Sequence, residues 1–334
     1  MNPDNRSNKS KTLIPIIIIL VVLLAAGAGF AVAKLGHQES VAPETPEGGS
    51  YDNTVDDGTI EYKGQKYKLN RDIETVLFLG VDYGSEEEEG TRIGTGQRAD
   101  AIFLFALDNR DKTARVIPIS RDTMTMVDAY DDKGNLAYSR EMQITLQYSF
   151  GDSPGRSCYL MKKAVSNLLY NAKIDSCLSI TLEGVNTIVD KIGGLELTMP
   201  EDYTYIDPRY EAGATVTLDG PETERFIRYR DTDVTGSNTD RVKRQSWLIG
   251  ELFKKLKAAG SSDMIENLMD AADEYIESDV SGETLKKISG YAMDQEMTGL
   301  PGEVIEGELH DEFHVDEEAL KAMVVDVFYV PVKE

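Results

Sequence analysis

The chain has 334 residues, and its 59 acidic residues exceed its 35 lysines and arginines, giving a formal net charge of −24. A surface of this sign repels phosphate backbones, so the composition argues against a nucleic-acid-binding protein. With 41% hydrophobic residues, the length is enough for one sizeable core or two modest ones.

The first apolar segment, 13–33, carries no charge over the length that a bilayer-spanning helix requires. Basic residues outnumber the single acid, Asp4, in the preceding segment 1–12, so we expect 1–12 to stay in the cytoplasm and the rest to lie outside. A cleaved secretory signal is the alternative, because Ala31-Val32-Ala33 resembles a cleavage site. The apolar run is long for a signal peptide, which favours a transmembrane anchor.

Proline, glycine and many acids make 34–58 typical of a flexible extracellular stalk. Apolar residues then alternate around Lys63-Gly64, which predicts a β-hairpin over 59–71. We expect the globular domain to run from 72 to 260, with 261–334 as a helical C-terminal part of the same domain.

Two continuous apolar runs, Val76–Val81 and Ala101–Leu107, predict strands that are buried on both faces of a sheet, and Ala114–Ser120 reads as a third strand. Polar residues flank these runs, namely Asp82 after the first, Arg98-Ala99-Asp100 before the second and Arg121-Asp122-Thr123 after the third. In α/β sheets such strand ends are where ligands bind. The i, i+2 spacing of Arg98 and Asp100 predicts that a cation and an anion ligand share a sheet face.

Strand and helix patterns alternate through the middle of the chain. The expected elements are a helix through Met161–Leu169, a strand at Cys177–Thr181, a helix at Leu182–Ile192 and a strand at Glu196–Met199. The helix between Cys158 and Cys177 is expected to keep these two cysteines too far apart for a disulfide.

In the C-terminal part, helices are expected at Met264–Ile276, Ser281–Met293 and Val315–Val325. His310–His314 has histidine spacing close to a zinc-binding helix, but Asp311 stands where the hydrolase motif requires glutamate. We therefore interpret this segment as a solvated loop.

One basic stretch runs against the acidic composition. Arg225–Arg230 reads as a strand, with Arg228 and Arg230 on one face. A helix is then expected to begin at Asn238 or Thr239.

The first turns of this helix place Arg241, Arg244 and Gln245 side by side. A helix N-terminus favours anions, and forked guanidinium groups match phosphate oxygens, so the stretch suits a pyrophosphate. Two carboxylates facing a pyrophosphate would suggest Mg²⁺, a hard ion that bridges carboxylate and phosphate oxygens. The alternatives are that the arginines pair with acidic side chains and that the aspartates only cap turns.

These segments together resemble the LytR–CpsA–Psr family. The matching pieces are Val76–Asp82, Arg98–Asp100, Ile119–Thr123, Val189–Gly194 and Leu218–Gly220, followed by Arg228, Arg230, Asp240-Arg241 and Arg244-Gln245. The resemblance covers about Ile60 to Ala258. It implies a single α/β domain with a central, mostly mixed β-sheet flanked by helices, outside the membrane of Gram-positive bacteria.

The resemblance also implies an activity. Members of the family hold a polyprenyl pyrophosphate in a long apolar pocket and transfer glycopolymers, such as teichoic acid or capsular polysaccharide, to peptidoglycan. Carried over by motif position, the pyrophosphate ligands would be Arg98, Arg121, Arg228, Arg230, Arg241 and Gln245. Asp82 and Asp100 would hold Mg²⁺.

A carboxylate should take the proton of the acceptor hydroxyl. Asp122, beside Arg121, is the candidate, with Asp82 or Asp100 as the alternative if one of them is not a metal ligand. Two positions depart from the family pattern: Ser120 stands where proline is usual, and Gln143–Tyr148 stands where many members have Lys-Ile-Asn.

Two other functions stay open from the sequence. One is a hydrolase that cleaves the lipid pyrophosphate with water as the acceptor. The other is a non-catalytic protein that binds the anionic lipid and regulates the envelope.

Overall fold

The computed structural model describes residues 58–83, 97–131, 134–229, 241, 243–245, 247–248, 251, 273–281, 284, 291–293, 298–307 and 310–332. The expected cytoplasmic segment, membrane anchor and nearly all of the stalk lie outside these residues. Among the helices of the described part, none is both long and apolar enough to cross a bilayer.

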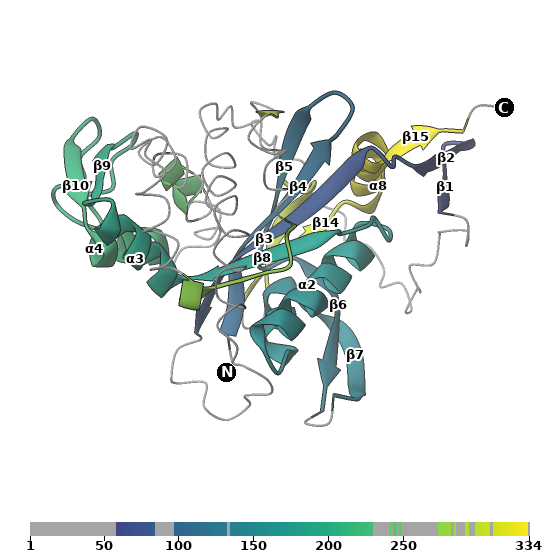
Figure 1. Ribbon diagram of the computed structural model, residues 1–334, viewed down its shortest axis with the longest axis horizontal. Helices are drawn as coiled ribbons and strands as arrows, with labels where there is room; N and C mark the ends of the chain where they lie inside the picture. The colour runs from purple at the N-terminus through teal and green to yellow at the C-terminus, as the bar shows by residue number, and fades with distance from the viewer. Residues whose placement is uncertain are drawn as a thin grey trace, which may run out of the picture.

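A six-stranded mixed sheet forms the centre of the molecule, in the order β11-β8-β3-β4-β5-β12 (Figure 1). Its strands are β3 (Ile73–Tyr83), β4 (Gln97–Asp108), β5 (Thr113–Ile119), β8 (Ser176–Thr181), β11 (Ile276–Ser278) and β12 (Ala292–Met293). β3 pairs with β4 in antiparallel and with β8 in parallel orientation. The expected α/β fold with a mixed central sheet is confirmed, and the three strands expected at its centre are β3, β4 and β5.

Helices cover both faces of this sheet. They are α2 (Pro154–Leu168), α3 (Leu182–Lys191), α4 (Gly220–Arg228) and α8 (Glu317–Phe328), with short 3₁₀ helices η2 (Ile144–Phe150) and η3 (Asp273–Tyr275).

Alternate residues of each strand enter two separate cores, because successive side chains point to opposite faces. Phe78 and Phe103 pack with α3 and α4, and we call this side the α4 face. Leu77 and Leu79 pack with α2 and α8, and we call this side the α2 face. The sheet is therefore the middle layer of three.

Four smaller sheets surround the central one. Their strands are β1 (Thr59–Tyr62), β2 (Gln65–Leu69) and β15 (Tyr329–Pro331); β6 (Met124–Tyr130) and β7 (Leu136–Gln143); β9 (Leu195–Thr198) and β10 (Thr215–Leu218); and β13 (Gly302–Glu306) and β14 (Asp311–Val315). Lys63 and Gly64 both have positive φ, 50° and 77°, as a two-residue hairpin turn requires. The predicted hairpin over 59–71 is confirmed by β1 and β2.

The C-terminal part is less helical than the sequence suggested. α8 replaces the helix expected at Val315–Val325, but 276–278, 292–293, 302–306 and 311–315 are strands. Met264–Ile276 lies largely outside the described residues, and its last residue belongs to β11. The solvated loop expected at His310–His314 is also wrong, because β14 pairs with β13 and lies against the start of β6. Alternation around the apolar Phe313 was the signal for this strand.

The two cysteines lie much closer together than expected. Both are buried on the α2 face, Cys158 in α2 and Cys177 in β8. The Cys158 thiol donates to Ser179 Oγ at 3.5 Å, one alternate position along the strand from Cys177. A hydrogen bond from the Cys177 thiol lowers the pKa of Cys158, and burial raises that of Cys177. The chain turns back after α2 so that β8 lies against this helix, which brings the two cysteines together. Both thiols are free, as expected.

Candidate functional site

The site begins at a break in the pairing of β3 and β4. Gly80 faces Ala101, but the next pair is Val81 with Ala99, so Asp100 is the extra residue of a β-bulge. Simple alternation between Arg98 and Asp100 therefore does not hold. Beyond the bulge, Arg98 faces Asp82 across the strands. Bulges commonly redirect side chains beside functional sites.

Arg121 links two carboxylates at this end of the sheet. Its Nη1 donates to Asp100 Oδ1 at 2.6 Å, and its Nε donates to Asp122 Oδ1 at 3.3 Å. Arg121 lies two residues after the end of β5, and its side chain is largely buried. The polar residues that flank three different strands in the sequence thus come together, as predicted.

Arg228 approaches the same sheet end from the α4 face. Its Nη2 lies 2.7 Å from Asp82 Oδ2, and its Nη1 lies 2.8 Å from Glu224 Oε1 one helical turn earlier. Partial burial would lower the pKa of Arg228, but Glu224, Asp82 and Asp100 together raise it above its ordinary value. The guanidinium is therefore fixed as a cation beside both candidate metal ligands.

The strand predicted at Arg225–Arg230 is wrong, because this segment up to Arg228 is the end of helix α4. Asp219 caps the helix by accepting from the backbone of Glu222, and the Glu222 carboxylate accepts from the backbone of Asp219. This capping box, with Pro221 in the first turn, was legible in the sequence and indicates a helix. Alternation of charged and apolar residues outweighed it in our interpretation.

Residues 241, 243–245, 247, 248 and 251 are helical, and this segment packs on the end of α4. Arg244 Nε donates to the Phe226 carbonyl at 2.7 Å, and its Nη2 donates to the Tyr229 carbonyl. Gln245 Nε2 donates to the Ile227 carbonyl at 3.1 Å. These side chains bind carbonyl groups at the end of α4 that helix geometry leaves without partners.

The other predicted basic ligands have surroundings that differ from those of Arg121 and Arg228. Arg241 is buried, and Arg98 is partly buried next to Asp82 in the strand register. Arg230 lies outside the described residues, so its predicted role stays a prediction. The same is true of the proposed helix start at Asn238 or Thr239.

Sequence reasoning missed two polar residues of the site. Gln143 Nε2 donates to Asp122 Oδ1 at 3.1 Å and to the Asp311 carbonyl at 2.9 Å. Thr145 Oγ1 lies 3.5 Å from Asp100 Oδ1, and its backbone N–H donates to the Arg121 carbonyl. Both belong to the segment that departs from the family pattern, and that departure was the only signal for them.

The candidate base Asp122 is enclosed. Its side chain is 6% exposed, against 24% for Asp100, and it accepts from both Arg121 and Gln143. Two hydrogen bonds already occupy this carboxylate, and little of it is accessible to an incoming hydroxyl. This arrangement suits Asp122 to fixing the Arg121 guanidinium.

Asp82 and Asp100 offer hard oxygen ligands at one sheet end, and each is neutralised by one arginine. Within the described part of the chain, no three His, Cys, Asp or Glu side chains are grouped to hold a metal by themselves. Mg²⁺ bound together with a phosphate substrate typically needs only one or two carboxylates. The donor set fits such a shared ion.

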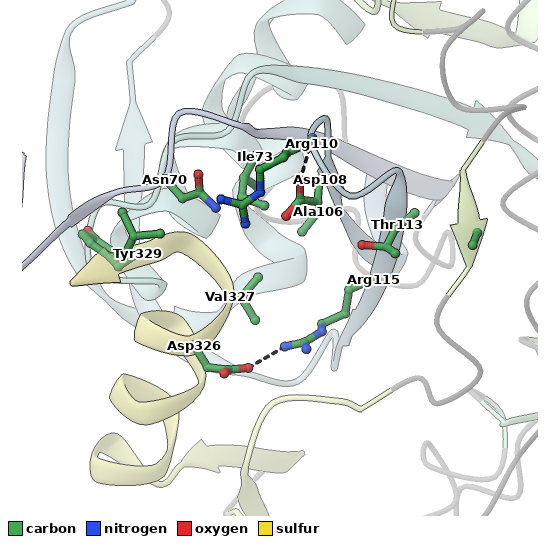
Figure 2. Close-up of a pocket in the computed structure, with 13 residues that line it drawn as sticks. Asn70, Ile73, Ala106, Asp108, Arg110, Thr113, Arg115, Asp326, Val327 and Tyr329 are labelled. Carbon is green, nitrogen blue, oxygen red and sulfur yellow. Dashed lines mark hydrogen bonds and ion pairs between the residues drawn. The ribbon is translucent and has the colours of Figure 1, made fainter.

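A cavity of about 730 Å³ lies at the opposite end of the sheet, by the turn between β4 and β5 (Figure 2). Figure 2 shows Arg110 and Arg115 directed into it from the hairpin, with Asp326 of α8 across from Arg115. Arg115 Nη1 lies 2.8 Å from Asp326 Oδ2. Its rim is charged and it is remote from Asp82 and Arg121. It is therefore not the apolar channel expected beside the arginines.

A model of the LytR_cpsA_psr family matches residues 44–325. The polyisoprenyl-teichoic acid–peptidoglycan teichoic acid transferase TagU of Enterococcus faecalis is 26% identical over 284 residues, covering 84% of each chain. The transferase of the same description, TagV of Bacillus subtilis, is 23% identical over 297 residues, covering 87% of this chain and 70% of the relative.

Solved structures share the fold. TagT bound to LI-WTA superposes with a TM-score of 0.55 at 19% identity, covering 77% of this chain and 90% of TagT. Protein gbs0355 from Streptococcus agalactiae superposes with a TM-score of 0.58 at 20% identity, covering 76% of this chain and 86% of gbs0355. At these identities, the likeness supports only the arrangement of the helices and strands. The chemistry has to be argued from the residues of the site.

Proposed function

The chain belongs to the LytR–CpsA–Psr family, and on that premise we propose that it is a glycopolymer transferase. It moves an anionic polymer, of the teichoic acid or capsular polysaccharide type, from a polyprenyl-pyrophosphate carrier to peptidoglycan. The relatives TagU and TagV are named for teichoic acid transfer to peptidoglycan, which supports this class of reaction. The proposal includes the anchor at 13–33, with the domain outside the cell membrane.

One observation carries the proposal. Arg121, from the end of β5, and Arg228, from the end of α4, each pair with an aspartate at the same end of the sheet. Two guanidinium groups held by carboxylates are pre-oriented, and a pyrophosphate can bind them without much further loss of side-chain freedom. Phosphoryl transfer depends mainly on such positioning and charge neutralisation.

In the proposed reaction, an acceptor hydroxyl of peptidoglycan attacks the phosphorus that carries the polymer. A new P–O bond forms, the P–O bond to the second phosphate breaks, and polyprenyl phosphate leaves. Arg121 and Arg228 neutralise the oxygens of the two phosphates, and Arg98, Arg230, Arg241 are further proposed ligands. Gln245 donates its amide to α4, which favours an indirect role for it through the position of Arg228.

Mg²⁺, when bound, would withdraw charge from the phosphate oxygens. Asp82 and Asp100 are the proposed ligands. Asp100 is also the better candidate for receiving the hydroxyl proton, because its side chain is 24% exposed, against 6% for Asp122. Asp122 would then hold Arg121 in position.

Asp100→Asn separates the two roles of Asp100. If Asp100 is mainly a metal ligand, activity is restored in part by raising the Mg²⁺ concentration. If it receives the proton, added Mg²⁺ does not restore activity. Asp122→Asn should lower activity in either case, with no change in the Mg²⁺ dependence.

The transfer itself is tested with the full chain in detergent, a polyprenyl-pyrophosphate-linked oligosaccharide, Mg²⁺ and peptidoglycan fragments. We expect a covalent polymer–peptidoglycan conjugate and polyprenyl phosphate in equal amounts. Release of lipid phosphate at the same rate without peptidoglycan, and with no conjugate, would identify a hydrolase. Tight lipid binding with no turnover under any of these conditions would identify a non-catalytic receptor.

A further inference from the structure

We propose that Glu224 of α4 and Asn186 of α3 are positioning residues, which hold the Arg228 guanidinium in place for the pyrophosphate of the donor. This inference rests on the proposed transferase function and adds which residues set the affinity for the donor. Both residues act on the substrate through Arg228, so neither is a catalytic residue.

Both carboxylate oxygens of Glu224 have partners. Its Oε1 accepts from Arg228 Nη1 at 2.8 Å, and its Oε2 accepts from Asn186 Nδ2 at 2.5 Å. A carboxylate only accepts hydrogen bonds, so the second contact also sets which way the Asn186 amide points. Because one partner comes from α3 and the other from the end of α4, the Glu224 side chain is fixed between the two helices.

Arg228 is held on two sides. Besides the contact of Nη1 with Glu224, its Nη2 lies 2.7 Å from Asp82 Oδ2 at the end of β3. A guanidinium has five N–H donors, so two carboxylate contacts leave others for phosphate oxygens. The side chain is 50% exposed, and these contacts restrict its rotamers before a ligand binds. The donor then loses less affinity to the ordering of this side chain.

The close packing of α3 on α4 brings Asn186 within reach of Glu224 (Figure 1). A Cβ atom at Gly220 would lie 2.7 Å from the Asn186 carbonyl oxygen, so a larger residue there would push the helices apart. The backbone N–H of Gly220 donates to Asp190 Oδ1 at 2.7 Å, and Asp190 lies one turn after Asn186 on α3. α3 thus fixes α4 at its first residue and again at Glu224.

The charge of Glu224 allows its role to be tested by the sign of the effect. A carboxylate next to a pyrophosphate repels it, so on charge alone the loss of Glu224 would strengthen donor binding. Partial burial would lower the pKa of Arg228, and its hydrogen bond to Glu224 is the largest effect that raises it. If Glu224 mainly orients Arg228, its loss weakens donor binding instead.

Binding of a short-chain polyprenyl pyrophosphate to the full chain in detergent measures this sign without catalysis. Glu224→Ala should weaken binding roughly two- to tenfold, the cost of ordering one long side chain on binding. Glu224→Gln keeps an oxygen that can accept from Arg228, so it should retain most of the affinity. Tighter binding by Glu224→Ala would overturn the inference.

A change at Asn186 tests the contact between the two helices. Asn186→Asp places a second carboxylate against Glu224, so it should weaken binding of the same lipid. The double variant Asn186→Asp/Glu224→Gln again places one donor against one carboxylate, with the two exchanged, and should recover the affinity. Unchanged affinity in Asn186→Asp would remove Asn186 from the proposal.

A double-mutant cycle shows whether Glu224 acts through Arg228. In the Arg228→Ala background, Glu224→Ala should cause no further loss of affinity, because the side chain that it orients is gone. Equal losses in both backgrounds would overturn the inference. In transfer assays, Glu224→Ala should lower kcat/KM for the lipid donor and leave the KM for peptidoglycan fragments unchanged.

Glu222→Ala is the matched control. Glu222 lies on the same helix, its side chain is 25% exposed against 28% for Glu224, and it pairs with Arg209 at 2.6 Å. The variant removes the same charge and should bind the lipid like the parent chain at a temperature where both are folded. An equal loss of affinity in Glu222→Ala would show that the charge of α4, and not the contact with Arg228, decides donor binding.

Modification by phenylglyoxal, followed by peptide mass spectrometry, examines Arg228 without any substrate. Arg228 should react faster in Glu224→Ala than in the parent chain, whereas the remote Arg115 should react equally in both. A parent chain that forms the conjugate, with unchanged donor affinity and Arg228 reactivity in Glu224→Ala, would overturn the inference and leave the transferase function standing. A parent chain that fails to bind the lipid, with Arg228 shielded by Glu224, would refute the function and keep the contact that orients Arg228.

Discussion

The two faces of the central sheet use alternate residues of the same strands, yet they are built differently. Leu77, Leu79 and Leu104 face α2 and are all 0% exposed. Phe78 and Phe103 face α4 and keep 9% and 6% of their surface exposed. At these strand positions the α2 face is thus lined by fully covered leucines, and the α4 face by phenylalanines that keep a small exposed fraction.

The aromatic layer continues away from the sheet. Phe226 of α4 contacts Tyr203 and Tyr210 edge to face, with ring centroids 5.3 and 5.6 Å apart, and also Trp247 at 5.9 Å. Edge-to-face contact is a favoured geometry for aromatic pairs. Because Arg228 reaches the site from the α4 face, we expect that face to accommodate the prenyl chain of the donor and the α2 face to supply stability.

A pair of core truncations gives the sharpest contrast between the faces. Leu79→Ala should lower the free energy of unfolding by about 2–5 kcal/mol, because it leaves a cavity in a closed core. Phe103→Ala should also destabilise the fold, by about 3–5 kcal/mol if the layer is fully packed and by less if it adjoins free space. Urea unfolding measures both values.

Donor affinity then separates the roles of the two faces. Phe103→Ala should weaken binding of a polyprenyl pyrophosphate, and Leu79→Ala should leave it unchanged at a temperature where both variants are folded. Equal losses of affinity in the two variants would show that the two faces do not have the separate roles that we expect.

The second contrast lies on the α4 face itself. Arg228→Ala should reduce turnover by about 10²–10³-fold, the usual effect of removing one donor that stabilises transition-state charge. Arg228 is half exposed, so the fold should be retained. Arg241 is buried, so its replacement is expected to affect stability as well as turnover.

Arg209→Ala is the control for Arg228→Ala. Its side chain is 49% exposed, against 50% for Arg228, and it likewise pairs with two carboxylates, Asp207 and Glu222. Turnover that falls equally in both variants would mean that Arg228 acts only through the charge of the α4 region.

The helix starts on the two faces provide a smaller contrast. α4 begins with a reciprocal capping box in which Asp219 accepts at 2.8 Å, whereas Ser153 caps α2 with a single long hydrogen bond of 3.4 Å. Asp219→Ala should therefore cost about 1–2 kcal/mol and Ser153→Ala about 0.5 kcal/mol. Thermal unfolding of the two variants ranks the caps, and the reverse order would contradict this interpretation.

The sequence allowed the central strands to be predicted, because a run such as Val76–Val81 can only be buried on both faces. It also allowed Asp82 and Arg121 to be placed near each other, since strand ends meet at one edge. The bulge at Asp100 was not predictable, because one added residue changes the face without changing the composition. Contacts of Gln143 with Asp122 depend on how a hairpin folds back, which no local pattern encodes.

α4 shows a different kind of error. Arg225–Arg230 alternates like a strand, and the decisive signal, Asp219 with Glu222 three residues later, lies before the segment. A short helix carries too few turns for its period to be recognised, so its cap is the better indicator. The prediction of an anion site did not depend on this error, because Arg228 reaches Asp82 from the end of a helix as well as it would from a strand.

The smallest predicted effect is a loss of stability at low pH, caused by Asp128 on the α2 side of the sheet. Burial would raise the pKa of Asp128, but hydrogen bonds from Lys163 and Ser139 lower it below its ordinary value. A carboxyl whose pKa is depressed by folding stabilises the fold above its unfolded pKa, about 3.9, and loses that contribution as the pH falls through the folded value. The Asp128 contacts should therefore contribute about 0.2–1 kcal/mol at pH 7 and progressively less below pH ~4.

Asp128→Asn removes the charge while keeping most of the shape, so it isolates this contribution. The difference in unfolding free energy between the parent chain and the variant should be present at pH 7 and shrink toward pH 3. Lys163→Met should reduce the same difference at pH 7, because the two side chains share one contact. A difference that stays constant between pH 7 and pH 3 would show that shape, and not charge, attaches the β6–β7 hairpin to α2.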